Sequence, residues 1–206
     1  MVSSPSTLVW YQVIKLSELL DPLQKDGLTE SQISDTRDAI RMVLKGIYDS
    51  VQPHQGDRNA YYVLFALTAY CDEIALSYLQ QQDNPGWEPL QVELFNISDA
   101  GTLFYRYAEL FRGRNDIPSL VFEIYYFCLK AGFKGGYITN PAARKAYLDE
   151  LEAHVSFEKM PLAGPIDDRE TRIMRRIPVW LYYCAVVVLV LLVRLTLETI
   201  PLEIGL

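Results

Sequence analysis

The sequence predicts an all-α protein in which a cytoplasmic helical bundle is followed by one C-terminal transmembrane helix. Apolar residues recur at helical spacing along most of the chain, and no segment alternates like a strand bounded by turn residues. Residues 177–193 contain no charged side chain. Half of the 206 residues are apolar. A chain of this length can bury enough surface to fold without disulfides or metals.

The composition narrows the class of function. The net charge of −7 repels phosphate backbones, so we expect no nucleic-acid partner. Cys71, Cys128 and Cys184 lie far apart and form no metal-binding or disulfide pattern. Only His54 and His154 could serve a histidine-dependent catalytic site. These counts disfavour a zinc site, and also a histidine-dependent triad unless one of these two histidines serves. With no hydrolase, metal-cluster or nucleotide-binding motif in the sequence, we predict no catalytic residue, no metal and no cofactor.

Two helices are predicted before residue 52. The first covers residues 8–20, after a Ser-Thr cap and before an Asp-Pro pair. The second begins between Thr29 and Ser31 and repeats apolar residues as far as Val51. Residues 52–56 contain a proline and a glycine, which predicts a linker.

The central helix is the most apolar one of the cytoplasmic part. Asp57 is predicted to cap it, and it reaches Tyr78. Because it is apolar on nearly all faces, we expect it in the middle of the bundle. A turn at 84–87 separates it from a short segment at 90–95.

Three further helices complete the predicted cytoplasmic domain. Ser98 is predicted to cap the first, which Gly113 closes. Asp116 is predicted to cap the second, which ends at Gly132 in a left-handed conformation. The third covers residues 140–153 and starts at an Asn-Pro pair.

The C-terminal part is predicted to anchor the chain in a membrane. Residues 158–176 read as a linker with a basic juxtamembrane segment, 177–197 as the transmembrane helix and 198–206 as a short periplasmic tail. At ~1.5 Å per residue the helix is about 31 Å long, which matches a ~30 Å hydrocarbon core. Arginines precede the span and only one lies at its far edge, so residues 1–157 should be cytoplasmic. The alternative is a fully buried core helix. The predicted anchor residues are Arg175, Arg176, Trp180, Tyr182, Tyr183 and Arg194.

Asp72 and Glu73 are the most unusual residues of the central helix, because they interrupt an otherwise apolar stretch. We predict that they bind a partner from an acidic cleft. The structural alternative is that each accepts backbone N–H groups from a neighbouring helix or pairs with an arginine such as Arg37 or Arg41. Adjacent helical residues point ~100° apart, so the two carboxylates cannot form a catalytic pair by themselves.

Other reactive-looking residues have structural explanations. Cys71 lies on the apolar stripe, which favours a buried, inert thiol. The glycines of 132–136 follow a helix and lack the spacing of a phosphate-binding loop. A tail-anchored hydrolase of unknown substrate, using Cys71 or an acidic residue, is the rival hypothesis. A eukaryotic tail-anchored fusion factor is less favoured, because the chain has no long heptad repeat.

Four segments, taken in chain order, resemble one family. They are ALTAYCDEIAL (66–76), Trp87 with PLQVELFN (89–96), Gly101 with Phe104, and FEIYYFCLKAGFKGGY (122–137). These resemble the DotU/TssL (IcmH-like) family of inner-membrane components of type IVB and type VI secretion systems. Gly136 stands where the family has a basic residue. The similarity extends from about Leu8 to the predicted anchor.

The resemblance implies a non-enzymatic, membrane-anchored assembly component. It implies two small helical bundles that form a hook, an inner-membrane location, and a single C-terminal span. The implied partners are an IcmF/TssM-like inner-membrane protein and cytoplasmic baseplate or ATPase-associated components, with self-association as a further expectation. The family's acidic cleft maps onto Asp72 and Glu73.

Overall fold

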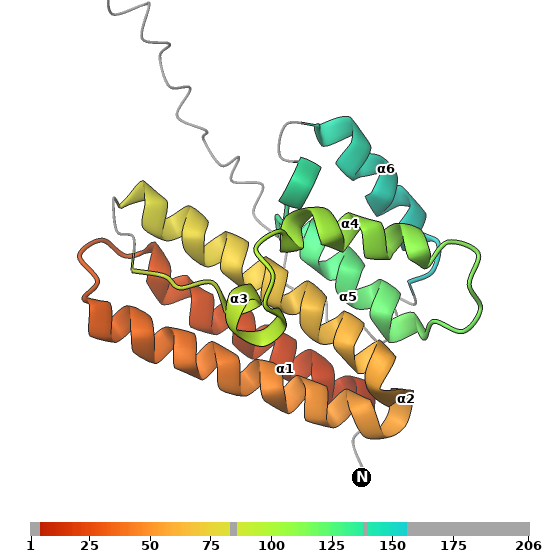
Figure 1. Ribbon diagram of the computed structural model, residues 1–206, viewed down its shortest axis with the longest axis horizontal. Coiled ribbons are helices and arrows are strands. Elements are labelled where there is room, and N and C mark those ends of the chain that lie inside the picture. The colour runs from red at the N-terminus through yellow and green to blue at the C-terminus, as the bar shows by residue number, and fades with distance from the viewer. Residues whose placement is uncertain (1–4, 83–85, 138–139, 156–206) are drawn as a thin grey trace, which may run out of the picture. The chain divides into compact units, whose positions relative to one another are not determined.

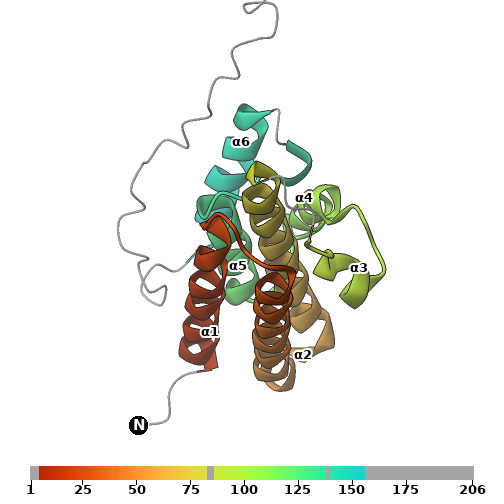
Figure 2. The same cartoon turned by 90° about the vertical axis from the view of Figure 1, so that its left-hand side faces the viewer.

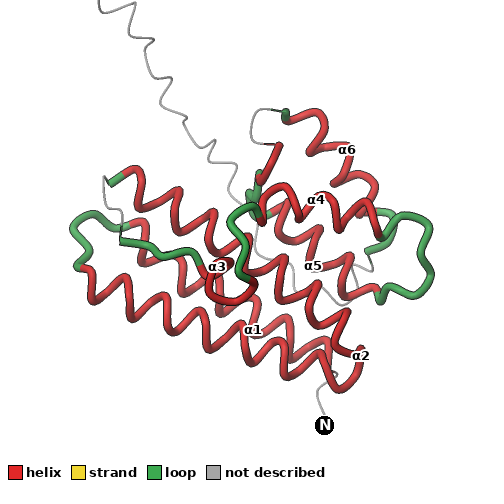
Figure 3. Tube along the Cα trace, in the orientation of Figure 1, coloured by secondary structure: helices red, strands yellow, loops and turns green. Residues whose placement is uncertain are grey.

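The computed structural model describes residues 5–82, 86–137 and 140–155, and these residues form helices and connecting loops with no strand (Figures 1 and 3). The all-α prediction is confirmed for this part of the chain. The predicted linker, transmembrane helix and tail, with all six predicted anchor residues, lie outside the described residues. The elements are α1 (Pro5–Leu20), η1 (Asp21–Gln24), α2 (Glu30–Gln81), α3 (Leu90–Phe95), α4 (Ala100–Leu110), α5 (Ser119–Lys130), η2 (Gly135–Tyr137) and α6 (Pro141–Glu152).

Helix α1 packs along α2, and Figure 2 shows them side by side with α3 and α4 on the other side of α2. Helix α2 starts where the sequence predicts, because Thr29 and Gln32 form a capping box. The α1–α2 contact is close at Gly46, where an added Cβ would lie 2.9 Å from Nε2 of Gln12. The buried α1 residues are Val9, Trp10, Val13, Leu16 and Leu20.

The predicted linker at residues 52–56 is wrong in extent. The chain stays helical through Pro53 and leaves helical geometry only at Gly56, with φ 78° and ψ 164°. Proline cannot donate the backbone hydrogen bond of a helix interior, and a positive φ is readily adopted by glycine. The two residues together bend α2 sharply, so that its first half (30–55) and second half (57–81) run back alongside each other (Figure 1).

The second half of α2 forms the centre of the bundle, as predicted. It contacts helices on several sides, including α3, α4 and α5. By length and composition alone, α2 is the helix among the described residues that could span a membrane, but most of its apolar window is buried inside the domain. A core helix passes the same test, and the burial supports that interpretation. Its fully buried residues include Val63, Phe65, Leu67, Cys71 and Ala75.

Two predicted N-caps are wrong. Helix α4 begins at Ala100 rather than after Ser98, and no side chain of its own N-cap residue accepts a hydrogen bond. Helix α5 begins after Pro118, and Asp116 instead forms ion pairs with Arg114 at 2.7 Å and Arg58 at 3.1 Å. Nearby guanidinium groups compete successfully with the helix end for this carboxylate, because charge-assisted hydrogen bonds are the stronger ones.

The two later helix boundaries are confirmed. Gly132 has φ 105°, and the backbone N–H of Phe133 donates to the carbonyl of Cys128 at 2.9 Å, which closes α5. Asn140 begins α6 by accepting the N–H of Ala143 at 3.0 Å.

Aromatic side chains join α4 and α5 to the second half of α2. Phe65 and Tyr107 meet edge to face with centroids 4.9 Å apart, and Phe104 and Tyr125 lie 4.4 Å apart. Each such pair contributes roughly 0.5–1.5 kcal/mol beyond its buried area. This packing fixes the start of α4 against the central helix, where Asp72 and Glu73 lie.

Candidate functional site: a cleft built on Asp72 and Glu73

Asp72 is 1% exposed and accepts three N–H groups from the segment that forms α3. Its Oδ1 accepts the indole N–H of Trp87 at 2.9 Å and the backbone N–H of Leu90 at 2.8 Å. Its Oδ2 accepts the backbone N–H of Gln91 at 2.8 Å. The N-cap residue of α3, Pro89, offers no side-chain acceptor. Asp72 therefore caps α3 from a different helix.

Glu73 caps a second segment in the same way. Its Oε1 accepts the backbone N–H of Lys134 and its Oε2 that of Gly135, both at 2.7 Å. Gly135 is the first residue of η2. The side chain of Glu73 thus fixes the loop that follows α5.

Gln91 and Gly101 connect the two capped segments. The side-chain oxygen of Gln91 accepts the N–H of Ala100 at 2.9 Å and so caps α4. A Cβ at Gly101 would lie 3.1 Å from Cα of Gly135, so only glycine allows α4 to approach the loop this closely. Helix α4 is therefore held from two sides. On one side Asp72 binds Gln91, which caps α4. On the other side Glu73 binds Gly135, which contacts Gly101 of α4.

The arginines proposed as alternative partners of the two carboxylates bind elsewhere. Arg37 donates to Glu93 at 2.6 Å and to the carbonyl of Glu88 at 2.7 Å. Arg41 pairs with Glu93 at 3.0 Å. The backbone N–H alternative is the one that the structure shows for both Asp72 and Glu73.

Burial and hydrogen bonding oppose each other in the electrostatics of the pair. Burial raises the pKa of Asp72 above its usual range, while the three N–H donors and the charge of Arg37 limit the rise. Burial also raises the pKa of Glu73, and the N–H groups of Lys134 and Gly135 oppose it. Glu73 is the more accessible of the two.

Both carboxylates line a cleft of about 480 Å³ between the second half of α2, α3, the start of α4 and the 133–136 loop. Its wall carries three carboxylates and one lysine, with exposed hydroxyl and amide groups between them. The polar lining residues are Asp72, Glu73, Ser77, Gln80, Gln91, Ser98, Asp99 and Lys134. An acidic, polar cleft of this kind can bind a cationic or hydrogen-bonding segment of a partner.

The cleft contains no activated nucleophile. Cys71 and Cys128 are fully buried and do not line it. Burial raises the pKa of both thiols, so they are protonated at neutral pH. Among the described residues, no group of three or more His, Cys, Asp or Glu side chains is arranged to hold a metal. These observations weaken the thiol version of the hydrolase hypothesis.

Sequence reasoning missed the part played by residues around the acidic pair. No sequence pattern around Gln91 identifies its side chain as the cap of α4, which begins nine residues later. Ser77 and Gln80 follow Glu73 on exposed turns of the same helix, which was the available signal that they share its cleft. Trp87, the last residue of the predicted turn at 84–87, is buried and donates its indole N–H to Asp72.

The four segments singled out in the sequence meet at this cleft. The segment 66–76 supplies the two carboxylates, and 87–96 supplies the donors to Asp72. The segment 122–137 supplies the loop that donates to Glu73, and Gly101 contacts this loop. Residues far apart in the chain therefore form one structural unit.

Comparisons with known proteins agree with this arrangement. The family model described as type VI secretion system protein DotU matches residues 14–200. The structure is similar to that of DotU from Francisella novicida, with a TM-score of 0.64 and 22% identity over 72% of this chain and 96% of the other. Among curated proteins there is no match. At this identity the structural likeness shows the fold, while the family match covers most of the chain. The chain therefore belongs to the DotU family of type VI secretion system proteins.

Proposed function

We propose that this protein is a non-enzymatic assembly component of a bacterial secretion system, anchored in the inner membrane by residues 177–197. Its cytoplasmic helical domain organises partners through the cleft that Asp72 and Glu73 build. The proposed partners are an IcmF/TssM-like inner-membrane protein and cytoplasmic baseplate components. Holding the domain beside the membrane raises the effective concentration of such partners, so modest interfaces suffice.

The observation that carries the proposal is the construction of the cleft. The carboxylates of Asp72 and Glu73, one buried and one half-buried, accept hydrogen bonds from four backbone N–H groups and one indole N–H, and so hold α3 and the 133–136 loop in place. This fixes the positions of exposed polar residues such as Ser98 and Asp99, which lie between α3 and α4, on the cleft wall. A preorganised polar surface binds with a smaller loss of side-chain entropy than a mobile one.

Asp72 and Glu73 contribute to docking in different ways under this proposal. Asp72 positions α3, and its charge adds to the negative potential of the cleft. Glu73 has part of its surface accessible, so its carboxylate can also accept a hydrogen bond from a partner. Replacing both Asp72 and Glu73 by lysine would leave the backbone N–H groups that they now accept facing cations. That double variant would disturb folding as well as docking, so it cannot separate the two.

A cleaner test uses an exposed cleft residue that caps nothing. Gln80→Arg places a long cation in the acidic cleft, and we expect loss of co-purification with the IcmF/TssM-like partner and loss of secretion. Gln81→Arg is the matched control, because Gln81 is the next residue of the helix and is also exposed, but its side chain lines a different cavity. Both variants should keep the wild-type helical circular dichroism. Equal secretion and co-purification by the two variants would contradict docking at the cleft.

The membrane anchor is tested separately. Carbonate-washed membranes should retain the full chain, and protease added outside spheroplasts should leave the helical domain intact. Release into the supernatant or digestion of the domain would contradict the proposed anchor and its orientation.

A further inference from the structure

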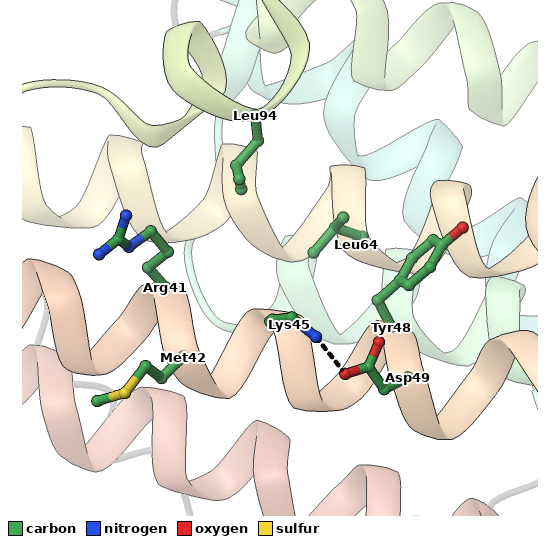
Figure 4. Close-up of a pocket in the computed structure, with 7 residues that line it drawn as sticks. All are labelled: Arg41, Met42, Lys45, Tyr48, Asp49, Leu64 and Leu94. Carbon is green, nitrogen blue, oxygen red and sulfur yellow. Dashed lines mark hydrogen bonds and ion pairs between the residues drawn. The ribbon is translucent and has the colours of Figure 1, made fainter.

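An open groove of about 630 Å³ on the first half of α2 gives no indication of a partner (Figure 4). Met42 lines this groove and an adjoining one against α1. The cations at its rim are already paired, Lys45 with Asp49 and Arg41 with two carboxylates. The charge of the groove is therefore balanced. A stronger indication comes from α5, where a carboxylate is buried without a donor.

Glu123 of α5 is a buried carboxylate that none of the described residues satisfies. The residue is only 1% exposed, and its Oε1 accepts no hydrogen bond from the described part of the chain. It also takes part in none of the ion pairs among the described residues. An ionised carboxylate buried without a partner is strongly unfavourable. Glu123 therefore needs a donor from outside the described residues.

The face of α5 that carries Glu123 is otherwise turned outward. Residues four before, four after and seven after a helical residue share its face. For Glu123 these are Ser119 and Lys130, which are exposed, and Phe127, which is half-buried. Burial in the middle of such a face indicates that a segment covers Glu123.

Helices α1 and α6 border this face on its two sides. Trp10 of α1 packs edge to face against Phe127, with ring centroids 5.8 Å apart. From the end of α6, the ring of His154 stacks on Phe122 at 4.7 Å. The indole Nε1 of Trp10 is also buried and donates to no described group. A covering segment between α1 and α6 would therefore meet one unused acceptor and one unused donor.

The chain leaves the described part of the domain at this place. Val155 follows the stacked His154 and packs against the core. Five residues separate His154 from Lys159, the first cation of the following sequence SFEKMP. An extended chain of five residues spans about 17 Å, so Lys159 can reach the carboxylate of Glu123, which is adjacent to Phe122.

Charge favours this segment over the other end of the chain. Residues 1–4, which precede α1, contain no charged side chain. Residues 156–161 offer the ammonium group of Lys159 to Glu123 and backbone carbonyls to the indole of Trp10. A lysine is a suitable partner for a buried carboxylate, because its long aliphatic part can pack against apolar side chains.

We propose that residues 156–161, called the strap below, bind across α5 between α1 and α6, with Nζ of Lys159 paired with the carboxylate of Glu123. Under the membrane anchor proposed above, the strap shortens the free tether to residues 162–176 and fixes the side of the domain from which the tether leaves. Only this consequence rests on the proposed anchor. The contact between Lys159 and Glu123 is independent of it.

The sign of one substitution tests the pair. Glu123→Gln keeps the shape of the side chain, and we expect it to lower the melting temperature of the full-length protein in detergent by about 5 °C. An unpaired buried charge would give the opposite result, because its removal stabilises a protein. Lys159→Gln should lower the melting temperature as well, and the double variant should lose no more than the less stable single variant. Lys145→Gln, at an exposed position of α6, is the control and should change it by less than about 1 °C.

Proteolysis tests the position of the strap directly. A lysine-specific protease should cleave native full-length protein slowly after Lys159, and Glu123→Gln should accelerate this cleavage at least ~10-fold. Lys145→Gln should leave the rate unchanged. An arginine-specific protease acting after Arg169, beyond the strap, should give the same rate for wild type and both variants.

Several results would overturn the proposal. They are a higher melting temperature in Glu123→Gln, additive effects of Glu123→Gln and Lys159→Gln, or equal cleavage after Lys159 in wild type and Glu123→Gln. Coupling of Glu123→Gln to Trp10→Phe but not to Lys159→Gln would identify the indole as the partner instead. Release of the chain from carbonate-washed membranes would contradict the anchor alone, because none of these measurements depends on a membrane.

Discussion

Replacing Asp72 by asparagine is expected to destabilise the helical domain although the two side chains have nearly the same shape. The carboxylate accepts N–H groups at both oxygens, with two donors on Oδ1 and one on Oδ2. Asparagine has a single oxygen, so its amide group must face at least one of these donors. In the better orientation the amide faces Gln91, and the N–H of Gln91 is left without an acceptor.

The magnitude follows from the bonds that are lost. A hydrogen bond to a charged acceptor is worth about 1.5–3 kcal/mol, and an orphaned buried donor costs about 1–3 kcal/mol. Removing a buried charge recovers part of this, because burial already disfavours the ionised Asp72. We therefore expect a loss of about 2–3 kcal/mol, which lowers the melting temperature by roughly 5–10 °C in a domain of this size.

The assay is thermal and urea unfolding of the full chain in detergent, followed by far-UV circular dichroism. Asp49→Asn is the matched control, since it removes an exposed carboxylate on the same helix that pairs, among the described residues, only with Lys45. Its expected effect is below about 0.5 kcal/mol. If Asp72→Asn were as stable as Asp49→Asn, the three hydrogen bonds would not support α3, and the reasoning about the cleft would fail.

Three further predictions follow from the same structure. Gly101→Ala places a Cβ 3.1 Å from backbone atoms of Gly135, so it should cost about 1–3 kcal/mol by thermal unfolding, and a wild-type melting temperature would contradict the close contact. Burial alone would raise the pKa of Glu93, but hydrogen bonds from two arginines hold it below its usual value. The stability that Glu93 contributes is therefore present at neutral pH and lost as the pH falls below about 4. The difference in melting temperature between wild type and Glu93→Gln should accordingly vanish in acid, and a difference that is constant with pH would refute this. Because burial raises the pKa of Cys71 and Cys128, peptide mapping after iodoacetamide treatment should find both unmodified in the native protein and modified in urea, whereas rapid native labelling would indicate an accessible thiol.

Local chemistry was sufficient for part of the helical pattern. The helix start near Thr29, the Gly132 termination and the Asn140 cap depend on residues within a few positions of the helix end, and all three are confirmed. The predicted cap at Ser98 is wrong because the acceptor for α4 comes from Gln91, on another helix. Local patterns cannot identify an acceptor that folding brings from elsewhere.

Sequence also identified the acidic pair without identifying its partners. Two carboxylates in an apolar helix are costly to bury, so Asp72 and Glu73 had to be paired, hydrogen-bonded or exposed at a site. The structure shows that their donors lie 15 to 19 residues away for Asp72 and 61 or 62 residues away for Glu73. The choice between an arginine and a backbone N–H group depended on how the helices pack.

By itself, the amino-acid order determined that the described part of this protein is helical and which of its helices is central, because periodicity and hydropathy act over neighbouring residues. Only the tertiary structure decided that the side chains of Asp72, Gln91 and Glu73 cap three separate segments and thereby shape one cleft. It also decided that Met42 separates two open grooves. Hydrogen bonds are directional and short, so these outcomes depend on the rotation and spacing of packed helices, which no local pattern specifies.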